Sequence, residues 1–237
     1  MVSLVLVTRP LEQAGEFAKA VMDCGAEALI CPMLKIVPRF FDPESFHLPD
    51  AVIVTSGQVF SCGADFSRVF HLPLYCVGAV TSDKARHAGF LDVRPFSQDV
   101  AALLENLTHD VPFGSRLLYL RGRDVRIDLE AVLPQYSLDQ KIIYQADPVG
   151  EFSPEIIRIF PEIHTVALFS ARSGVVFARH MLQYGFQNMM GGVNLLSLSS
   201  VVQESVSEFE WRSRVIAPQP DMLSMVCALT TLLQEKK

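Results

Sequence analysis

Residues 52–56 read VIVTS and residues 167–170 read ALFS, so each of these apolar, β-prone runs ends in a serine. A continuous apolar run is typical of a parallel strand whose two faces are both covered by helices. Similar runs predict strands over residues 4–8, 27–31, 51–55, 74–78, 91–94, 116–120, 139–144, 165–169, 194–198 and 213–217. Amphipathic patterns predict helices over 11–23, 80–88, 99–108, 124–134, 172–184, 200–209 and 221–234. The sequence therefore predicts an α/β fold with doubly wound parallel sheets.

The strand ends fall into two sets of similar sequences. One set is TRP at 8–10, FS at 169–170, LS at 198–199 and APQPD at 217–221. The other is TS at 55–56, VG at 77–78, RPFSQD at 94–99 and LRG at 120–122. The arginine-bearing strand comes first in one set and last in the other, which favours one domain inserted in the other. We expect a discontinuous α/β domain over 1–34 plus 148–237, an inserted α/β domain over 39–140, and linker strands over 35–38 and 141–147.

Composition and motifs exclude several classes of protein. The net charge of −6 over 237 residues argues against a general nucleic-acid binder. The longest apolar runs are far shorter than a membrane span, and the first residues lack the features of a signal peptide, so we expect a cytoplasmic chain that does not enter a membrane. The five cysteines have neither CxxC spacing nor a histidine cluster nearby, and no dinucleotide or phosphate-loop motif occurs. We therefore expect neither a metal nor a cofactor.

Ligands of open parallel sheets bind outside the carboxyl ends of the strands, where the two sets of motifs fall. If the two domains face each other, these ends line a common cleft. Helices are expected to begin just after Ser56, Gly78, Ser170 and Ser199, and the free N–H groups of a helix start attract anions. Ordinary helix capping by serine and threonine is the alternative interpretation of these positions.

Two further features stand out near the expected domain boundary. The segment 121–126 reads RGRDVR and carries three arginines against one aspartate, a pattern that suits carboxylate binding or a solvated helical turn. Tyr144 lies in an expected linker strand, where its phenol could act as a donor or weak acid, or could simply pack between strands.

Taken together, these pieces resemble the uroporphyrinogen-III synthase (cosynthase) family. The matching segments are LVTRPLEQA at 6–14, GAEALICPMLKIVP at 25–38, AVIVTSGQVF at 51–60, VGAVTSDKARHAGF at 77–90, LLYLRG at 117–122, IIYQADP at 142–148, ALFSARSGVVF at 167–177 and APQPDMLSMV at 217–226. Each segment alone is loose, but the ordered set is specific and runs over nearly the whole chain.

The resemblance implies two flavodoxin-like domains, one inserted in the other and joined by a two-stranded linker. It also implies a cofactor-free hydro-lyase that cyclises hydroxymethylbilane to uroporphyrinogen III with loss of water and inversion of ring D. Such an enzyme is expected to be a monomer that makes at most transient contact with hydroxymethylbilane synthase.

The resemblance also assigns roles to residues. Tyr144 matches the family's tyrosine at the linker and is the expected catalytic residue. The expected substrate-binding residues are Ser56, Thr81, Gly122, Arg126, Ser170, Ser199 and Pro220. This chain departs from some members at Gln58, where they carry a basic residue, and at Val201 and Val202, where they carry threonines.

Two alternative functions remain at this point. One is a non-catalytic two-domain binding protein or an inactive cosynthase-like paralogue, although this chain retains the tyrosine and the hydroxyl residues that such a protein would lose. The other is a nucleotide-dependent transferase, which the missing phosphate loop and the missing metal-binding carboxylate pair argue against.

Overall fold

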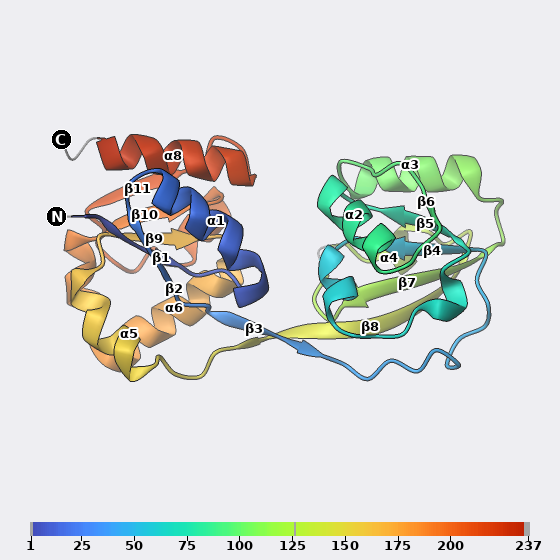
Figure 1. The fold of residues 1–237 in the computed structure, drawn as a ribbon, viewed down its shortest axis with the longest axis horizontal. Coiled ribbons are helices and arrows are strands. Elements are labelled where there is room, and N and C mark those ends of the chain that lie inside the picture. The colour runs from blue at the N-terminus through green and yellow to red at the C-terminus, as the bar shows by residue number, and fades with distance from the viewer. Residues whose placement is uncertain (1, 126, 235–237) are drawn as a thin grey trace. The chain divides into compact units, whose positions relative to one another are not determined.

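The computed structural model describes residues 2–125 and 127–234 (Figure 1). The chain divides into two compact units. Unit 1 contains the residues up to Lys35 and those from Asp147 onward, and unit 2 contains Ile36–Ala146.

Unit 1 is built on a five-stranded parallel sheet in the order β11-β10-β9-β1-β2. Its strands are β1 (Leu4–Val7), β2 (Glu27–Ile30), β9 (Thr165–Leu168), β10 (Asn194–Ser197) and β11 (Ser213–Ile216). Its helices are α1 (Leu11–Asp23), α5 (Pro154–Ile159), α6 (Ala171–Tyr184), α7 (Ser200–Glu204) and α8 (Met222–Gln234), with short 3-10 helices η3 (Phe160–Glu162) and η4 (Gln187–Gly192).

The sheet of unit 1 is buried by helices on both faces (Figure 1). On one face, Val5 and Val7 pack with Phe17 of α1 and Leu229 of α8 in one buried cluster. Figure 1 shows α5 and α6 on the opposite face. Because every residue of β1 is buried, the strand reads as a continuous apolar run rather than an alternating one.

Unit 2 contains the six-stranded sheet β3-β8-β7-β4-β5-β6. Its strands are β3 (Leu34–Pro38), β4 (Ala51–Val54), β5 (Pro73–Cys76), β6 (Asp92–Val93), β7 (Arg116–Gly122) and β8 (Ser137–Pro148). Its helices are α2 (Ala79–His87), α3 (Val100–Asp110) and α4 (Leu129–Val132), with 3-10 helices η1 (Gly57–Ser61) and η2 (Ser67–Val69).

Alternate residues of β4 face opposite sides of this sheet, and each side has its own core. Val52 and Val54 pack in a cluster with Ala85 of α2. Ala51 and Ile53 pack in a second cluster, which includes leucines of α3 and α4. The sheet of unit 2 is therefore also covered on both faces.

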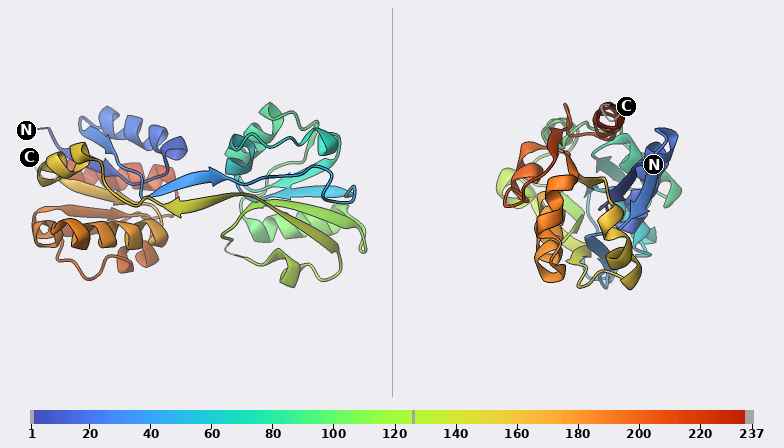
Figure 2. Two further views of the ribbon diagram at one scale, coloured as in Figure 1. Left: turned by 90° about the horizontal axis from the view of Figure 1, so that it is seen from below. Right: turned by 90° about the vertical axis from the view of Figure 1, so that its left-hand side faces the viewer.

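The strands β3 and β8 contain the two points at which the chain passes from one unit to the other, and they pair with each other (Figure 2). The N–H of Val149 donates to the carbonyl of Met33 at 2.9 Å, and the N–H of Arg39 donates to the carbonyl of Ile143 at 2.8 Å.

The two sheets have the same spatial order once the repeated strand ends are aligned. In unit 1, the strands in the order β11-β10-β9-β1-β2 correspond to β6-β5-β4-β7-β8 in unit 2. Numbered along the chain, unit 1 has the order 2-1-3-4-5 that is typical of flavodoxin-like sheets. Unit 2 has the same arrangement, but its first strand in the chain is β4, which corresponds to β9 of unit 1. The fold class predicted from the sequence is thus confirmed, and the repeat explains why the arginine-bearing strand changes its place in the chain order.

Some of the expected helices were wrong in length, and one helix was missed. The helix expected over 200–209 ends at Glu204, because the hydroxyl of Ser205 bonds the carbonyl of Val202 and the chain continues as turns. Of the helix expected over 124–134, the structure has α4 at Leu129–Val132, where Asp128 caps its start. The short α5, which begins at Pro154 with a Ser153 cap, was not expected from the sequence.

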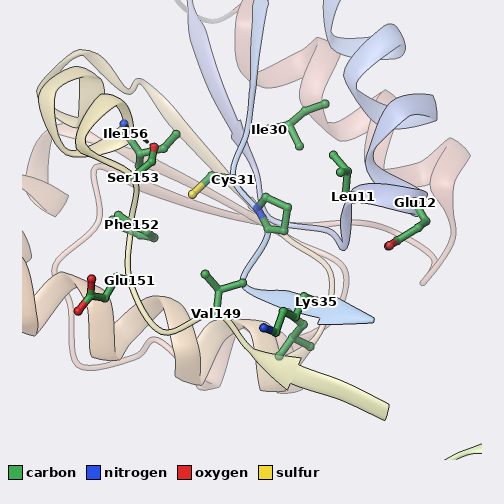
Figure 3. A pocket seen from close by; sticks show the side chains of 12 residues that line it. Leu11, Glu12, Ile30, Cys31, Lys35, Val149, Glu151, Phe152, Ser153 and Ile156 are labelled. Atoms are coloured by element: carbon green, nitrogen blue, oxygen red, sulfur yellow. Dashed lines mark hydrogen bonds between the residues drawn. The ribbon is translucent and has the colours of Figure 1, made fainter. Parts of the chain in front are cut away.

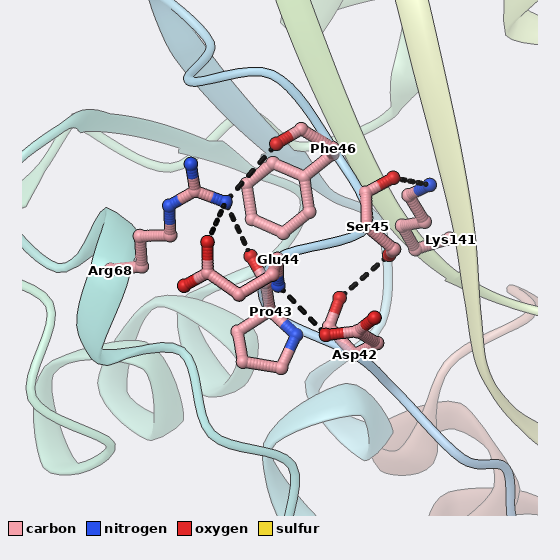
Figure 4. A network of polar contacts seen from close by, with 7 residues as sticks. All are labelled: Asp42, Pro43, Glu44, Ser45, Phe46, Arg68 and Lys141. Atoms are coloured by element: carbon pink, nitrogen blue, oxygen red, sulfur yellow. Dashed lines mark hydrogen bonds and ion pairs between the residues drawn. The ribbon is translucent and has the colours of Figure 1, made fainter.

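The connection from β3 to β4 is held by side chains rather than by regular structure (Figure 4). The guanidinium of Arg68 donates to the carbonyls of Pro43 at 2.6 Å and Phe46 at 3.1 Å, and it lies 5.2 Å from the centre of the Phe46 ring. The ammonium of Lys141, on β8, donates to the carbonyl of Ser45 at 2.8 Å. These contacts satisfy carbonyl groups that no helix or strand would satisfy.

Candidate active site

The carboxyl ends of β4 and β7 lie side by side at the point where the strand order of unit 2 reverses. From β4 the chain proceeds to β5 and β6 on one side, whereas β7 and β8 lie on the other. Such a switch point is the usual ligand site of an open α/β sheet. Thr55 and Ser56 follow β4 directly, and Gly122 ends β7.

Tyr144 of β8 belongs to this switch point, because its phenol hydrogen-bonds the side chain of Ser56. Its ring also lies against Gly122, its register partner on β7. A Cβ atom on Gly122 would lie 2.8 Å from Cζ and 3.0 Å from the hydroxyl oxygen of Tyr144. Only glycine therefore leaves room for the phenol in this position. The structure thus brings together three residues that the sequence singled out.

The environment of Tyr144 keeps its phenol protonated. Burial raises the pKa of Tyr144 above its usual value of 10, and the hydrogen bond with Ser56 opposes this shift in part. At neutral pH the group is consequently a proton and hydrogen-bond donor.

The start of α2 provides main-chain donors at the same edge, because β5 lies next to β4. Gly78 precedes α2 with a φ of 81°, a conformation that favours glycine, and no side chain caps the helix there. Thr81, in the first turn, is 6 % exposed and packs beside Gly57, where an added Cβ atom would lie 3.3 Å from the Thr81 Cα. The first N–H groups of α2 are therefore available to an anion.

The switch point contains a second hydroxyl pair that the sequence reasoning missed. The hydroxyls of Thr55 and Tyr119 lie 2.8 Å apart. In the sequence, Tyr119 stands out only as part of the segment LLYLRG at 117–122. Its place near the carboxyl end of β7 was the available signal, but its partner across the sheet could not be read from spacing.

In unit 1 the predicted residues have different surroundings. Ser170 caps α6: its hydroxyl accepts from the N–H of Ser173 at 3.1 Å and donates to the Ser173 hydroxyl at 2.9 Å. Ser199 precedes α7 without a side-chain cap. Pro220 lies exposed in the loop before α8, and Arg126 lies outside the described residues. The side chain of Ser170 therefore acts as an ordinary helix cap, which is the alternative interpretation given above.

Unit 1 also has a charged side chain at its own switch point, between β1 and β9. The guanidinium carbon of Arg9 lies 4.9 Å from the centre of the Phe169 ring, and the group donates to the side chain of Gln13 at 3.2 Å. This stacking joins the end of β1 to the end of β9.

A pocket of about 400 Å³ lies in unit 1, after the carboxyl end of β2 (Figure 3). Its walls are mostly apolar, with charged side chains of both signs among them. The lining residues are Leu11, Glu12, Ile30, Cys31, Pro32, Leu34, Lys35, Val149, Glu151, Phe152, Ser153 and Ile156. None of the predicted substrate-binding residues that the structure describes lines this pocket.

Residues 2–125 and 127–234 offer neither a metal-binding cluster nor a membrane-spanning helix. They contain no group of three or more histidine, cysteine, aspartate or glutamate side chains placed to hold a metal ion. No helix in this part of the chain is both long and apolar enough to cross a membrane.

Comparisons with known proteins agree with the fold and identify the family. The chain resembles the uroporphyrinogen-III synthetase structure from Helicobacter pylori at 13 % identity and a TM-score of 0.64, over 98 % of this chain and 100 % of that one. It resembles a mutant uroporphyrinogen III synthase from Thermus thermophilus at 17 % identity and a TM-score of 0.54, over 99 % of this chain and 100 % of that one.

At these identities the structural likeness establishes the fold alone. No curated protein matches the chain significantly. The sequence model of the family described as uroporphyrinogen-III synthase HemD matches residues 15–227, which is most of the chain. The chain therefore belongs to the uroporphyrinogen-III synthase family, whose members are cyclising hydro-lyases of tetrapyrrole biosynthesis.

Proposed function

We propose that Tyr144 is the proton donor with which this protein, as a uroporphyrinogen-III synthase, cyclises hydroxymethylbilane to uroporphyrinogen III. The observation that carries the proposal is the placement of the Tyr144 phenol, bonded to Ser56 and packed against Gly122 at the switch point of unit 2. Family membership gives the reaction, and the position of the phenol supports the choice of Tyr144 as the proton donor.

The reaction needs little covalent help from the protein. A pyrrole nitrogen lone pair pushes out the hydroxymethyl oxygen as the carbon–oxygen bond breaks, and that oxygen leaves as water when it gains a proton. A neutral phenol can provide this proton and can be reprotonated when the substrate loses a proton at ring closure. The protein must also hold the bilane so that ring D closes in the inverted sense through a spiro intermediate.

Substrate binding is proposed for groups on both units. The bilane carries carboxylate side chains, for which main-chain N–H groups and hydroxyls are suitable donors. We assign this role to the first turn of α2 with Thr81, to Ser56 and Gly122, and to the helix starts after Ser170 and Ser199. Since the hydroxyl of Ser170 is already engaged, its helix start would contribute main-chain donors. Arg126 and Pro220 complete the proposed set.

The remaining proposals concern the setting of the enzyme. We propose that the enzyme is a cytoplasmic monomer. We also propose that it works without a cofactor, because the pyrrole nitrogens themselves drive the departure of water. Transient contact with hydroxymethylbilane synthase would shorten the time that the reactive bilane spends free in solution.

The test is a product analysis. The purified protein is supplied with hydroxymethylbilane generated by its synthase, and the oxidised products are separated by isomer. We expect an excess of the type III isomer over a reaction without the protein. Formation of the type I isomer alone would contradict the proposal and would favour a non-catalytic binding protein.

A further inference from the structure

Two consecutive residues each interact with one tyrosine: Thr55 with Tyr119, and Ser56 with Tyr144. The two tyrosines come from opposite faces of the sheet. Tyr119 packs in the cluster that includes α3 and α4, whereas Tyr144 packs against the cluster that includes α2. Ser56 is extended, with φ −150° and ψ 126°. Because successive side chains of an extended segment point to opposite faces, one dipeptide can meet both phenols.

By distance alone either hydroxyl could be the donor in the bond between Tyr119 and Thr55, but the two groups differ in acidity. Tyr119 is 2 % exposed, and burial raises the pKa of its phenol, so the group stays protonated. A phenol is a stronger acid than an aliphatic alcohol, and an alcohol oxygen is a good acceptor. We therefore take Tyr119 as the donor and Thr55 as the acceptor in this 2.8 Å bond.

With Tyr119 as the donor, the hydroxyl proton of Thr55 is not used in the bond between the two residues. The pair has two hydroxyl protons, and its mutual bond uses one of them. Within residues 2–125 and 127–234, neither hydroxyl has a further hydrogen-bond partner. Tyr119 is buried, but Thr55 is only half-buried, so the remaining proton is on the accessible member of the pair. Accepting a bond from Tyr119 also strengthens Thr55 as a donor.

We propose that Thr55 is a further substrate-binding residue, which donates a hydrogen bond to a carboxylate of the bilane, and that Tyr119 is the residue that positions it. This inference rests on the proposed function, since it names one contact of the same site. It differs from the role of Tyr144, because a binding donor acts on substrate affinity rather than on the departure of water.

The experiment compares KM and kcat for hydroxymethylbilane among four variants. Thr55→Val and Tyr119→Phe keep the shape of the side chains and remove one hydroxyl each. We expect each to raise KM about tenfold, the effect of one bond to a charged group, with kcat within about twofold of wild type. Thr55→Ser should keep KM near wild type. The double variant should be no worse than Thr55→Val, because both substitutions break one chain of bonds.

The matched control is Tyr136→Phe. Tyr136 belongs to the same buried cluster as Tyr119, and its hydroxyl donates to the carbonyl of Val111 at 2.8 Å, away from the switch point. Its loss should lower the thermal midpoint without changing KM. The inference is overturned if Tyr119→Phe leaves KM unchanged, if it changes KM no more than Tyr136→Phe does, or if the two hydroxyl deletions add.

The wild-type protein separates this inference from the proposed function. An excess of the type III isomer from wild type together with unchanged KM values in the variants would reject the role of Thr55 alone. Production of only the type I isomer by wild type would reject the proposed function itself.

Discussion

Tyr144 carries the chemical step of the proposal, so its hydroxyl should matter more than any other in unit 2. We expect Tyr144→Phe to lower kcat by about 10²-fold, the lower end of general acid catalysis, because the hydroxymethyl group is already reactive. The ring is retained, so the thermal midpoint should change little more than in Tyr136→Phe. A kcat within about twofold of wild type would show that water or a substrate carboxyl delivers the proton.

Gly122 should be required for the position of that phenol. An alanine Cβ would lie 2.8 Å from Cζ of Tyr144, so Gly122→Ala must displace the ring or the strand. We expect a loss of about 1–3 kcal/mol in the free energy of unfolding and a kcat approaching that of Tyr144→Phe. Gly150→Ala is the control, since nothing lies within 4 Å of a Cβ there. Equal kcat values for the two alanine variants would contradict the packing argument.

The sequence predicted part of this site because some of its residues follow strands directly. Ser56 and Gly122 end apolar runs, so their place at the carboxyl edge could be inferred from pattern. Tyr144 stands out by its place in an expected linker strand, and the family resemblance implies its catalytic role. The bond of Tyr119 to Thr55 escaped prediction, because residues 64 positions apart meet only through the pairing of β4 with β7.

The helices α6 and α7 are preceded by serines, Ser170 and Ser199, whose side chains have different contacts. Ser170 makes cap bonds, whereas Ser199 makes none through its side chain. We expect Ser170→Ala to cost about 1 kcal/mol of unfolding free energy, and Ser199→Ala less than about 0.5 kcal/mol. Chemical denaturation of both variants measures the difference. Equal losses would mean that the hydroxyl of Ser199 has a structural role that its geometry does not show.

Strands were easier to predict than short helices for a physical reason. A strand covered on both faces has to be apolar along its length, as in Ala51–Val54, so its signal is local. The short α5 and α7 have too few turns to develop a clear periodicity, and their ends depend on single bonds such as that of Ser205 to Val202.

The same strand order occurs in both sheets, but the chain begins at a different strand of that order in each unit. The corresponding strands of units 1 and 2 share a spatial order. At each switch point a pair of side chains joins the ends of the two central strands. The pair is Arg9 with Phe169 in unit 1 and Thr55 with Tyr119 in unit 2.

The buried phenols of unit 2 make the stability of the protein sensitive to alkaline pH. Burial, followed by the neighbouring Asp110, raises the pKa of Tyr75 from 10 to about 12, and burial also raises the pKa values of Tyr119, Tyr136 and Tyr144. A folded-state pKa above the unfolded value means that the fold favours the neutral phenol. This contribution is fully present below pH 10 and is lost as the pH rises towards 12.

We therefore expect the free energy of unfolding to fall between pH 10 and 12, together with the appearance of tyrosinate absorbance. Tyr75→Phe isolates one phenol. It removes the hydrogen bond to Asp110, which is 3.2 Å long, and so should lower stability at neutral pH. Above pH 10 it should lose stability less steeply than wild type, because one ionising group is gone. Parallel curves for the two proteins over this range would show that Tyr75 ionises as readily in the folded chain as in the unfolded one, and the alkaline loss would then belong to the other phenols.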